Sequence, residues 1–229
     1  MIYITTHKDF QVPEFVNDSN YMIITDGVEL RSQYPTKIIE ANNRLQPMKH
    51  CYSEGFQMYD IWMKDNTSEY IGINHYRRYF CMQRDNDNIR ENVLPPKLDF
   101  NVYTQYGFCH NIDDLFKVKD IIDKYYEGYD TNNLNGLYTC NMFILEHEIF
   151  NKYCRFMFGV LDIFNEQNNL NTDKDVENYI IANKDKYSMW DFNYQSRLYG
   201  FLMERIGTIF FNKYFEDKPV KLDKYFITE

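Results

Sequence analysis

The segment best suited to chemistry is His75-Tyr76-Arg77-Arg78, which directly follows the apolar run Glu69–Asn74. Arginine suits phosphate because its planar fork donates two parallel hydrogen bonds. A histidine adds a further donor or a proton. Such a cluster suits a diphosphate leaving group, whose negative charge grows as a glycosidic bond breaks. A solvated strand end whose arginines pair with the chain's many acids is an equally good reading of these residues alone.

The elements that must position this segment alternate between strands and helices along much of the chain. Short apolar, β-branched runs predict the strands Ile2–Thr6, Tyr21–Thr25, Glu69–Asn74 and Leu137–Leu145. Apolar residues at helical spacing predict the helices Pro47–Lys64, Asn111–Tyr126, Glu148–Phe164 and Asp191–Phe211. The polar run Leu170–Lys186 is expected to be surface or a mobile lid. This order predicts an α/β fold, with a sheet covered on both faces and ligands at the C-terminal ends of its strands.

The length and composition of the chain fit one domain, residues 1–229. Its cysteines indicate a reducing compartment. A net charge of −9 argues against a nucleic-acid partner. The five cysteines have no C-x-x-C spacing and sit mostly in apolar stretches, so buried reduced thiols are expected. The start of the chain does not read as a signal peptide, and no run approaches the roughly 20 apolar residues that cross a bilayer. We therefore expect a cytoplasmic protein.

Several stretches together resemble the capsular and exopolysaccharide biosynthesis glycosyltransferase-like family, long catalogued as a domain of unknown function. The most recognisable is Gly72–Phe80, which carries H-Y-R-R-Y-F after a strand. The opening run Ile2–Lys8 also ends in His-Lys, and Asn141–Ile144 is similar to an Asn-Met-Phe segment. Tyr59–Lys64 and Arg197–Arg205 resemble two helices of that family. The likeness runs from about residue 2 to residue 210.

The resemblance implies a hexosyltransferase with a GT-A-like, Rossmann-like domain, whose mostly parallel sheet is flanked by helices. It implies a nucleotide-sugar donor, with a UDP-hexose such as UDP-galactose favoured, and a glycan or lipid-linked glycan acceptor in capsular, exopolysaccharide or surface-polysaccharide synthesis. Peripheral membrane association stays open. The residues expected to bind the donor are Thr5, His7, Lys8, His75, Tyr76, Arg77, Arg78 and Asn141.

The last predicted helix supplies the catalytic candidates. At about 100° per residue, Arg197, Gly200 and Glu204 fall on one narrow face. A glycine inside a helix costs roughly 1 kcal/mol against alanine, so something is expected to approach closely there, such as a sugar ring. An inverting transferase needs a carboxylate base, and Asp191 and Glu204 are the candidates, with Arg197 beside them. An ion pair around a packing glycine, and a helix cap at Asp191, are the competing structural roles.

Metal dependence stays open, with Mn²⁺ or Mg²⁺ as the candidate cofactor. Asp85 and Asp87 form an Asp-x-Asp pattern that suits a hard cation bridging to phosphate, but a solvated turn is the better interpretation in so Asn- and Asp-rich a chain. Arginine is a candidate substitute for the metal. Two other functions compete: a non-catalytic carbohydrate- or nucleotide-binding module, and a phosphate-ester hydrolase.

Overall fold

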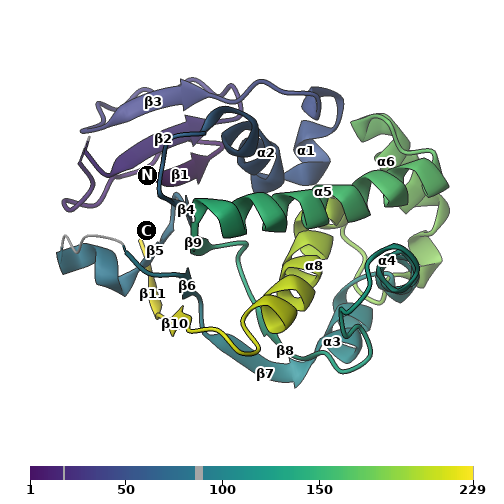
Figure 1. Ribbon diagram of the computed structural model, residues 1–229. Helices are drawn as coiled ribbons and strands as arrows, with labels where there is room; N and C mark the ends of the chain where they lie inside the picture. The colour runs from purple at the N-terminus through teal and green to yellow at the C-terminus, as the bar shows by residue number, and fades with distance from the viewer. Residues whose placement is uncertain (18, 86–89, 229) are drawn as a thin grey trace.

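The computed structural model describes residues 1–17, 19–85 and 90–228, which form a mostly parallel central sheet flanked by helices (Figure 1). Its main path runs β10-β6-β9-β4-β1-β2-β3. The strands of that path are β1 Ile2–Thr6, β2 Tyr21–Thr25, β3 Lys37–Glu40, β4 Tyr70–His75, β6 Val93–Leu94, β9 Phe143–Glu146 and β10 Lys221–Leu222. Two further strands, β5 Arg78–Phe80 and β11 Tyr225–Ile227, join this sheet off the path, while β7 Lys97–Asn101 and β8 Asn135–Tyr138 pair separately. The expected α/β fold is confirmed.

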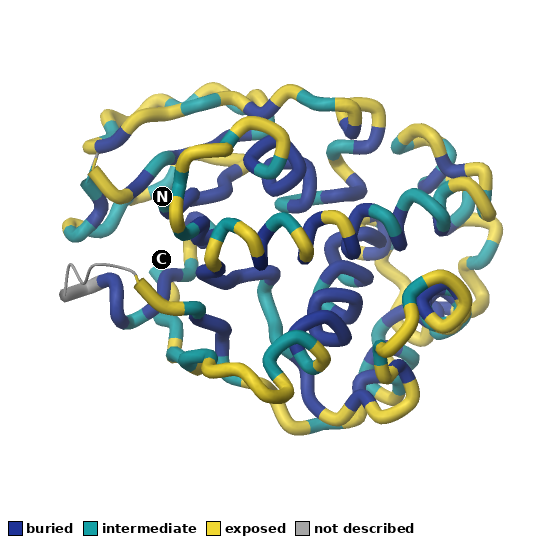
Figure 2. Tube along the Cα trace, in the orientation of Figure 1, coloured by how far each residue is buried: buried dark blue, intermediate teal, exposed yellow. Residues whose placement is uncertain are grey.

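The inward faces of the long helices are buried (Figure 2). The helices are α1 Lys49–Tyr52, α2 Glu54–Lys64, α3 Val102–Cys109, α4 Ile112–Tyr125, α5 His147–Asn168, α6 Asp173–Ala182, α7 Phe192–Gln195 and α8 Leu198–Tyr214. Three short 3₁₀ turns accompany them: η1 Gln46–Met48, η2 Cys81–Asp85 and η3 Lys184–Lys186. None of the helices in the described part of the chain is long and apolar enough to cross a membrane.

Successive side chains of β1 point to opposite faces of the sheet, and the two faces pack against different residues. Tyr3 joins the large core formed with the helices, whereas Ile2 and Ile4 join a second cluster. That second cluster is closed by loop side chains such as Phe10 and Phe15. Loops therefore cover one face of β1, and helices cover the other.

The strand order creates a switch point beside β1. The chain runs from β1 outward through β2 to β3 on one side, then returns as β4 on the other side of β1. Both neighbours are parallel to β1, so Thr5 lies opposite Ile24 on β2 and His75 on β4. The C-terminal ends of these strands consequently meet at one edge. In open α/β sheets this is where ligands bind.

Three predicted elements are interrupted, and each interruption occurs where the backbone leaves regular geometry. The Pro47–Lys64 helix breaks at Ser53, whose φ is 51°. The Leu137–Leu145 strand is two strands, β8 and β9, joined by a turn in which Cys140 and Asn141 have φ of 72° and 48°. The Asp191–Phe211 helix is α7 followed by α8, with Arg197 between them.

The polar run Leu170–Lys186 is structured where the sequence suggested surface or a lid. Thr172 and Asp175 form a capping box that begins α6. Val176 and Ile180 are then buried on one side of that helix. In contrast, the predicted start of α4 is confirmed, because Asn111 accepts a hydrogen bond from the Asp113 amide.

Asp114, on α4, is a fully buried acid. The Tyr179 hydroxyl donates to one of its carboxylate oxygens, and the other oxygen has no partner among the described residues. Burial raises the pKa of Asp114 to about 6, although the Tyr179 hydrogen bond and Lys117 act in the opposite direction. Because the pKa is raised on folding, the fold favours the protonated acid, and stability is lost as the pH rises from about 4 through 6.

We expect Asp114→Asn to stabilise the protein at neutral and alkaline pH, since the amide keeps an acceptor for Tyr179 without a buried charge. A pKa moved from 3.8 to about 6 makes the stability gap between variant and wild type roughly 1 kcal/mol larger at pH 8 than at pH 5. Denaturant unfolding at both pH values measures this gap. A gap that is constant with pH would show that Asp114 does not titrate differently in the folded chain.

Candidate functional site

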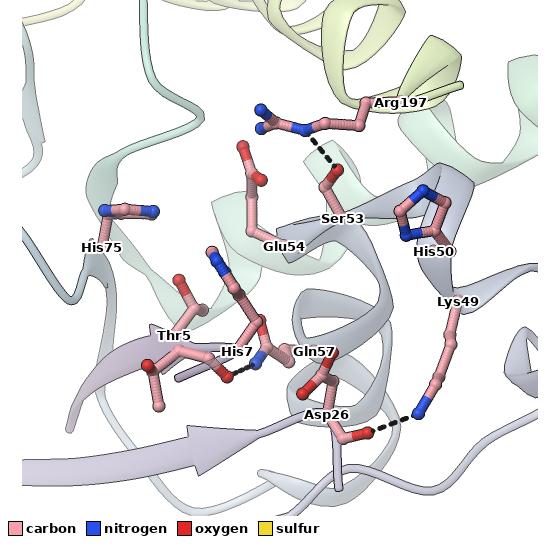
Figure 3. Close-up of a pocket in the computed structure, with 11 residues that line it drawn as sticks. Thr5, His7, Asp26, Lys49, His50, Ser53, Glu54, Gln57, His75 and Arg197 are labelled. Carbon is pink, nitrogen blue, oxygen red and sulfur yellow. Dashed lines mark hydrogen bonds between the residues drawn. The ribbon is translucent and has the colours of Figure 1, made fainter. Parts of the chain in front are cut away.

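A pocket of about 180 Å³ opens at the switch point (Figure 3). Residues at the ends of β1, β2 and β4 form one wall, and residues around the break between α1 and α2 form the other. The lining residues are Thr5, Thr6, His7, Asp26, Lys49, His50, Ser53, Glu54, Gln57, His75 and Arg197. We call this the first pocket.

Side-chain hydrogen bonds to backbone carbonyls fix the strand ends that form this pocket. The Gln57 side chain donates to the carbonyls of Thr6 and Ile24, at 2.7 and 3.0 Å, so α2 is tied to β1 and β2. The Thr5 hydroxyl donates to the Asn74 carbonyl at 3.0 Å and ties β1 to β4. These bonds satisfy buried polar groups and hold the pocket wall in a defined geometry.

His75 lies at the end of β4 and is surrounded by positive charge. Burial first, and then the charges of Arg78, Arg77, His7 and Arg197, lower its pKa to about 3. The ring is therefore neutral at physiological pH. Its Nδ1 accepts a hydrogen bond from the Arg77 amide at 3.2 Å, so the ring proton is on Nε2. His75 thus presents a neutral N–H donor at the pocket.

The cations near His75 form no ion pair with the described residues, although Glu54 lines the first pocket with Arg197. Lys8, Arg77, Arg78 and Arg197 form no ion pair with an acid in the described part of the chain. Arg197 instead donates from Nε to the Ser53 hydroxyl at 3.2 Å. Asp26 and Glu54 also line the first pocket, so unpaired cations and acids share this edge of the sheet. The alternative that these arginines pair with the chain's acids is not what the described residues do.

Tyr76 is part of the support beneath the pocket, and it lines neither pocket described here. Its side chain is buried in the cluster that covers the loop face of β1. The Lys8 ammonium and the Arg77 guanidinium lie 5.2 and 5.1 Å from its ring centre. Lys8 and Arg77 are exposed and also line neither pocket, so of the predicted His-Tyr-Arg-Arg cluster only His75 and Arg78 face a hollow.

A second pocket of about 330 Å³ adjoins the first. Both are lined by Glu54 and Arg197, so these two residues stand where the pockets meet. The second pocket is lined by acidic and basic side chains together with aromatic rings. Its lining residues are Glu54, Arg78, Leu98, Phe100, Gln105, His110, Leu137, Thr139, Cys140, Tyr194, Arg197, Gly200, Phe201, Glu204 and Arg205.

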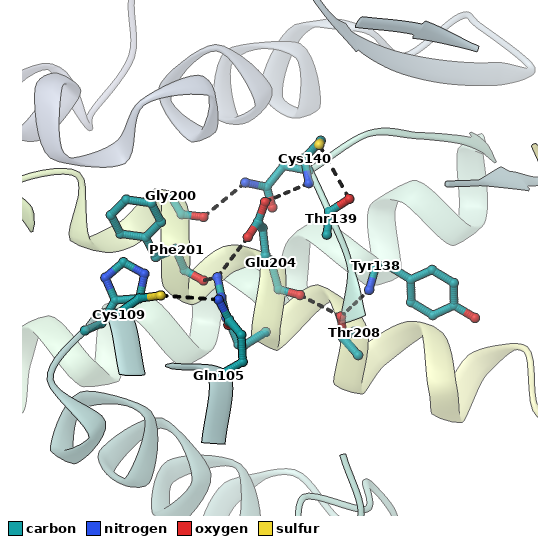
Figure 4. Close-up of polar contacts among 12 residues, drawn as sticks. Gln105, Cys109, Tyr138, Thr139, Cys140, Gly200, Phe201, Glu204 and Thr208 are labelled. Carbon is teal, nitrogen blue, oxygen red and sulfur yellow. Dashed lines mark hydrogen bonds and ion pairs between the residues drawn. The ribbon is translucent and has the colours of Figure 1, made fainter. Parts of the chain in front are cut away.

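The turn between β8 and β9 holds two carboxylates of the second pocket, and Figure 4 shows its contact with one of them, Glu204. The Cys140 amide donates to Glu204 Oε1 at 2.7 Å, and the Asn141 side chain donates to Glu54 Oε1 at 2.9 Å. Arg205 donates to the other Glu204 oxygen at 2.8 Å. Burial raises the pKa of Glu204 despite these bonds, and nearby Glu54 raises it too. The predicted site residue Asn141 is therefore placed to orient Glu54.

Backbone strain gathers at this junction. Four non-glycine residues of the described chain have positive φ, and three of them, Ser53, Cys140 and Asn141, border Glu54 or Glu204. Such conformations cost on the order of 1–3 kcal/mol each and persist where the surroundings impose them. The close approach expected at Gly200 is made by Ser53, because a Cβ there would lie 3.4 Å from the Ser53 hydroxyl oxygen.

Asp191 does not lie with the other catalytic candidates. Its side chain accepts a hydrogen bond from the Tyr194 amide at 3.1 Å and caps α7. It is exposed and lines neither pocket. The geometry thus supports the capping role that the sequence left open. Glu204, on α8, and Arg197, which precedes α8, both line the second pocket.

The metal candidates remain untested by geometry. Asp87 lies outside the described residues, and the side chain of Asp85 is not described. Among the described residues no group of three or more His, Cys, Asp or Glu is arranged to hold a metal ion. At the end of β4 the Arg78 guanidinium repels a cation, and the neutral His75 presents an N–H rather than a free lone pair. These two side chains do not fit a divalent metal.

Sequence reasoning missed Asp26, Lys49 and Glu54. Asp26 follows β2 directly, as His75 ends β4, so adjacency to a parallel strand was the available signal. Glu54 was hidden inside a helix that was predicted to be continuous. The rings of Phe100, Tyr194 and Phe201 carried no signal among the chain's 21 Tyr and 18 Phe.

The chain belongs to the family described as a domain of unknown function (DUF4422), whose model matches residues 1–98 and 90–216. This confirms the expected resemblance to a domain of unknown function, whose description names no capsular or exopolysaccharide role. The fold is similar to the apo structure of WbbM, a bifunctional glycosyltransferase, with a TM-score of 0.71 and 19% sequence identity. The match covers 100% of this chain and 45% of that one, so the chain spans less than half the length of WbbM. No curated protein matches the chain.

Because Asp191 caps α7, we expect Asp191→Ala to lower the free energy of unfolding by about 1 kcal/mol. Asp191→Ser, which keeps a capping oxygen, should be close to wild type. Neither variant should change donor binding, measured by calorimetry. Loss of turnover in both variants at full donor affinity would return Asp191 to the catalytic candidates.

Proposed function

We propose that this chain transfers a hexose from a nucleotide-sugar donor to a glycan acceptor. The observation that carries the proposal is the neutral His75 donor among unpaired cations, in a pocket at the switch point of the sheet. A UDP-hexose such as UDP-galactose is the favoured donor, and capsular, exopolysaccharide or other surface-polysaccharide synthesis is the favoured setting. Both follow from the family resemblance. The fold shared with WbbM supports the general class.

In this proposal the donor diphosphate lies between His75 and Arg197, close to Arg78. His75 donates through Nε2–H, and the guanidiniums supply charge-assisted hydrogen bonds. The nucleoside extends toward the end of β2, where the Asp26 carboxylate offers acceptors to a base N–H or a ribose hydroxyl. The donor hexose then reaches the junction of the two pockets at Glu54. Thr5 and His7 also contribute to the donor pocket. Lys8 and Arg77 line neither pocket and act on the donor only through their electrostatic field.

The proposed reaction forms a bond between an acceptor oxygen and the anomeric carbon and breaks the bond from that carbon to the diphosphate. The cations around His75 stabilise the charge that develops on the departing diphosphate. Glu204 accepts the hydroxyl proton, since its raised pKa brings it nearer the working pH of a base. Glu54, at the junction, stabilises positive charge on the anomeric carbon. Arg205 and the Cys140 amide keep Glu204 in place.

We also propose that the reaction takes place in the cytoplasm, with an acceptor that can be lipid-linked at a membrane surface. All five cysteines are unpaired thiols, which fits a reducing compartment. The donor and acceptor identities are tested by a thermal-shift screen with UDP, GDP, CMP and dTDP sugars, followed by transfer assays.

We expect Arg78→Ala to weaken UDP binding about 10- to 100-fold, because it removes a charge-assisted interaction worth roughly 1.5–3 kcal/mol. Arg77→Ala should weaken binding by only about 3-fold, since an exposed charge acts through screened water. Arg155→Ala on α5, also exposed but outside both pockets, is the matched control. Unchanged UDP affinity in both Arg77 and Arg78 variants would remove the pocket assignment.

We expect Glu204→Gln to abolish sugar transfer, by a factor of about 10² or more, while the donor dissociation constant stays within a few-fold of wild type. Donor hydrolysis with and without Mn²⁺, measured beside transfer, separates the functions. A wild-type protein that binds donor but neither hydrolyses nor transfers it would favour the non-catalytic binding module. Full activity of Glu204→Gln would refute its role as the base.

A further inference from the structure

His110 forms part of the wall of the second pocket, and its tautomer is fixed by Gln195. The Gln195 amide nitrogen donates to the carbonyls of Cys109 and Met189, both at 2.8 Å, so its oxygen is left as an acceptor. That oxygen lies 2.8 Å from His110 Nδ1. Nδ1 must therefore carry the proton, and Nε2 is an acceptor. No described residue bonds to Nε2.

Burial keeps the His110 ring neutral. Burial and the nearby Arg205 together lower the pKa of His110 to about 4, although the Gln195 hydrogen bond acts in the opposite direction. The ring therefore offers a lone pair rather than a charge at working pH. A hydroxyl is a suitable partner for such a group.

Aromatic rings continue from His110 to the surface. The Phe201 ring lies 4.1 Å from the His110 ring and 4.7 Å from the Tyr194 ring, centre to centre. His110 and Tyr194 are stacked at an interplanar angle of 14°. Tyr194 is 41% exposed, although most tyrosines of this chain are buried or half-buried. The rings of His110, Phe201 and Tyr194 thus form a continuous aromatic surface from the pocket to solvent, which we call the ledge.

The polar groups that line the second pocket include both hydrogen-bond donors and acceptors. Glu54 and Glu204 accept hydrogen bonds, Arg78 and Arg197 donate them, and His110 Nε2 accepts. A pyranose ring has one face of C–H groups that stacks on an aromatic ring, and a rim of hydroxyls that both donate and accept.

We propose that the second pocket binds a pyranose ring of the acceptor glycan, stacked on Tyr194 and Phe201 with a hydroxyl donated to His110 Nε2. The identification of this sugar as the acceptor rests on the proposed transferase function, because Glu54 and Arg197 join this pocket to the donor pocket. The exposed end of the ledge at Tyr194 leaves room for the rest of an acceptor chain to continue into solvent.

The test uses methyl β-galactopyranoside, methyl α-glucopyranoside and methyl α-mannopyranoside as probes in saturation-transfer NMR with the full chain. At least one should bind, with the strongest transfer to its C–H face. Tyr194→Ala and His110→Phe should each weaken that binding at least 5-fold, whereas Tyr194→Phe should keep it within 2-fold. Tyr125→Ala, a tyrosine 50% exposed on α4, is the matched control and should behave as wild type. Circular dichroism confirms that each variant is folded.

A parallel UDP titration separates the two proposals. If UDP binds but no hexoside does, or if hexoside binding survives both Tyr194→Ala and His110→Phe, this inference is overturned and the transferase proposal stands. If hexosides bind as expected and UDP does not, the sugar site stands and the donor pocket falls. Displacement of a bound hexoside by uridine alone would show that the ledge stacks a nucleobase, and would also overturn the inference.

Discussion

Positive charge that forms no ion pair within the described chain, at the C-terminal edge of β1 and β4, is the constraint on which the site depends. Arg78, Arg77, His7 and Arg197 all act on His75, and together with burial they hold its ring neutral. Gathering like charges costs free energy, and this chain has acids in excess with which to neutralise them. Asp26 and Glu54 line the same pocket, yet none of these cations forms an ion pair in the described chain, so they are available to the negative charge of a ligand. The parallel strand order then explains why the charges meet where β1 and β4 end.

The second constraint is that the two glutamates come from distant parts of the chain and still meet. Glu54 begins α2 and Glu204 lies within α8, and the turn at Cys140 and Asn141 bonds to both. The residues beside the two glutamates, Ser53, Cys140 and Asn141, have positive φ, which is unfavourable for the local backbone. The same residues separate elements that would otherwise be continuous, so backbone strain and site geometry have one origin. Rigid strands and the long helices α5 and α8 provide the packing that sustains it.

The sequence was sufficient for the regular parts of the fold. The β1 and β2 boundaries are as predicted, because both are uninterrupted apolar strands, and α4 begins at the predicted Asn111 cap. It was insufficient where geometry departs from local preference. The breaks at Ser53 and Cys140 carry no glycine to mark them, and tertiary contacts alone impose their φ values. A continuous apolar pattern therefore read as one helix or one strand.

The same limit applies to the candidate site. His75, Arg78, Arg197 and Glu204 were found because they have chemistry suited to phosphate or proton transfer and lie at a strand end or on one helix face. Tyr76 was placed in the pocket by adjacency, but its ring turns to the loop side of β1. Asp191 was a candidate by residue type alone, and its local hydrogen bond to the Tyr194 amide decides its position.

The most direct measurement of the central claim compares UDP with uridine by isothermal titration, at low and at high salt. If unpaired cations around His75 form a diphosphate site, UDP binds at least 100-fold more tightly than uridine at low salt, and the difference shrinks as salt rises. Equal affinity for the two ligands, or a UDP affinity that is indifferent to salt, would contradict the account.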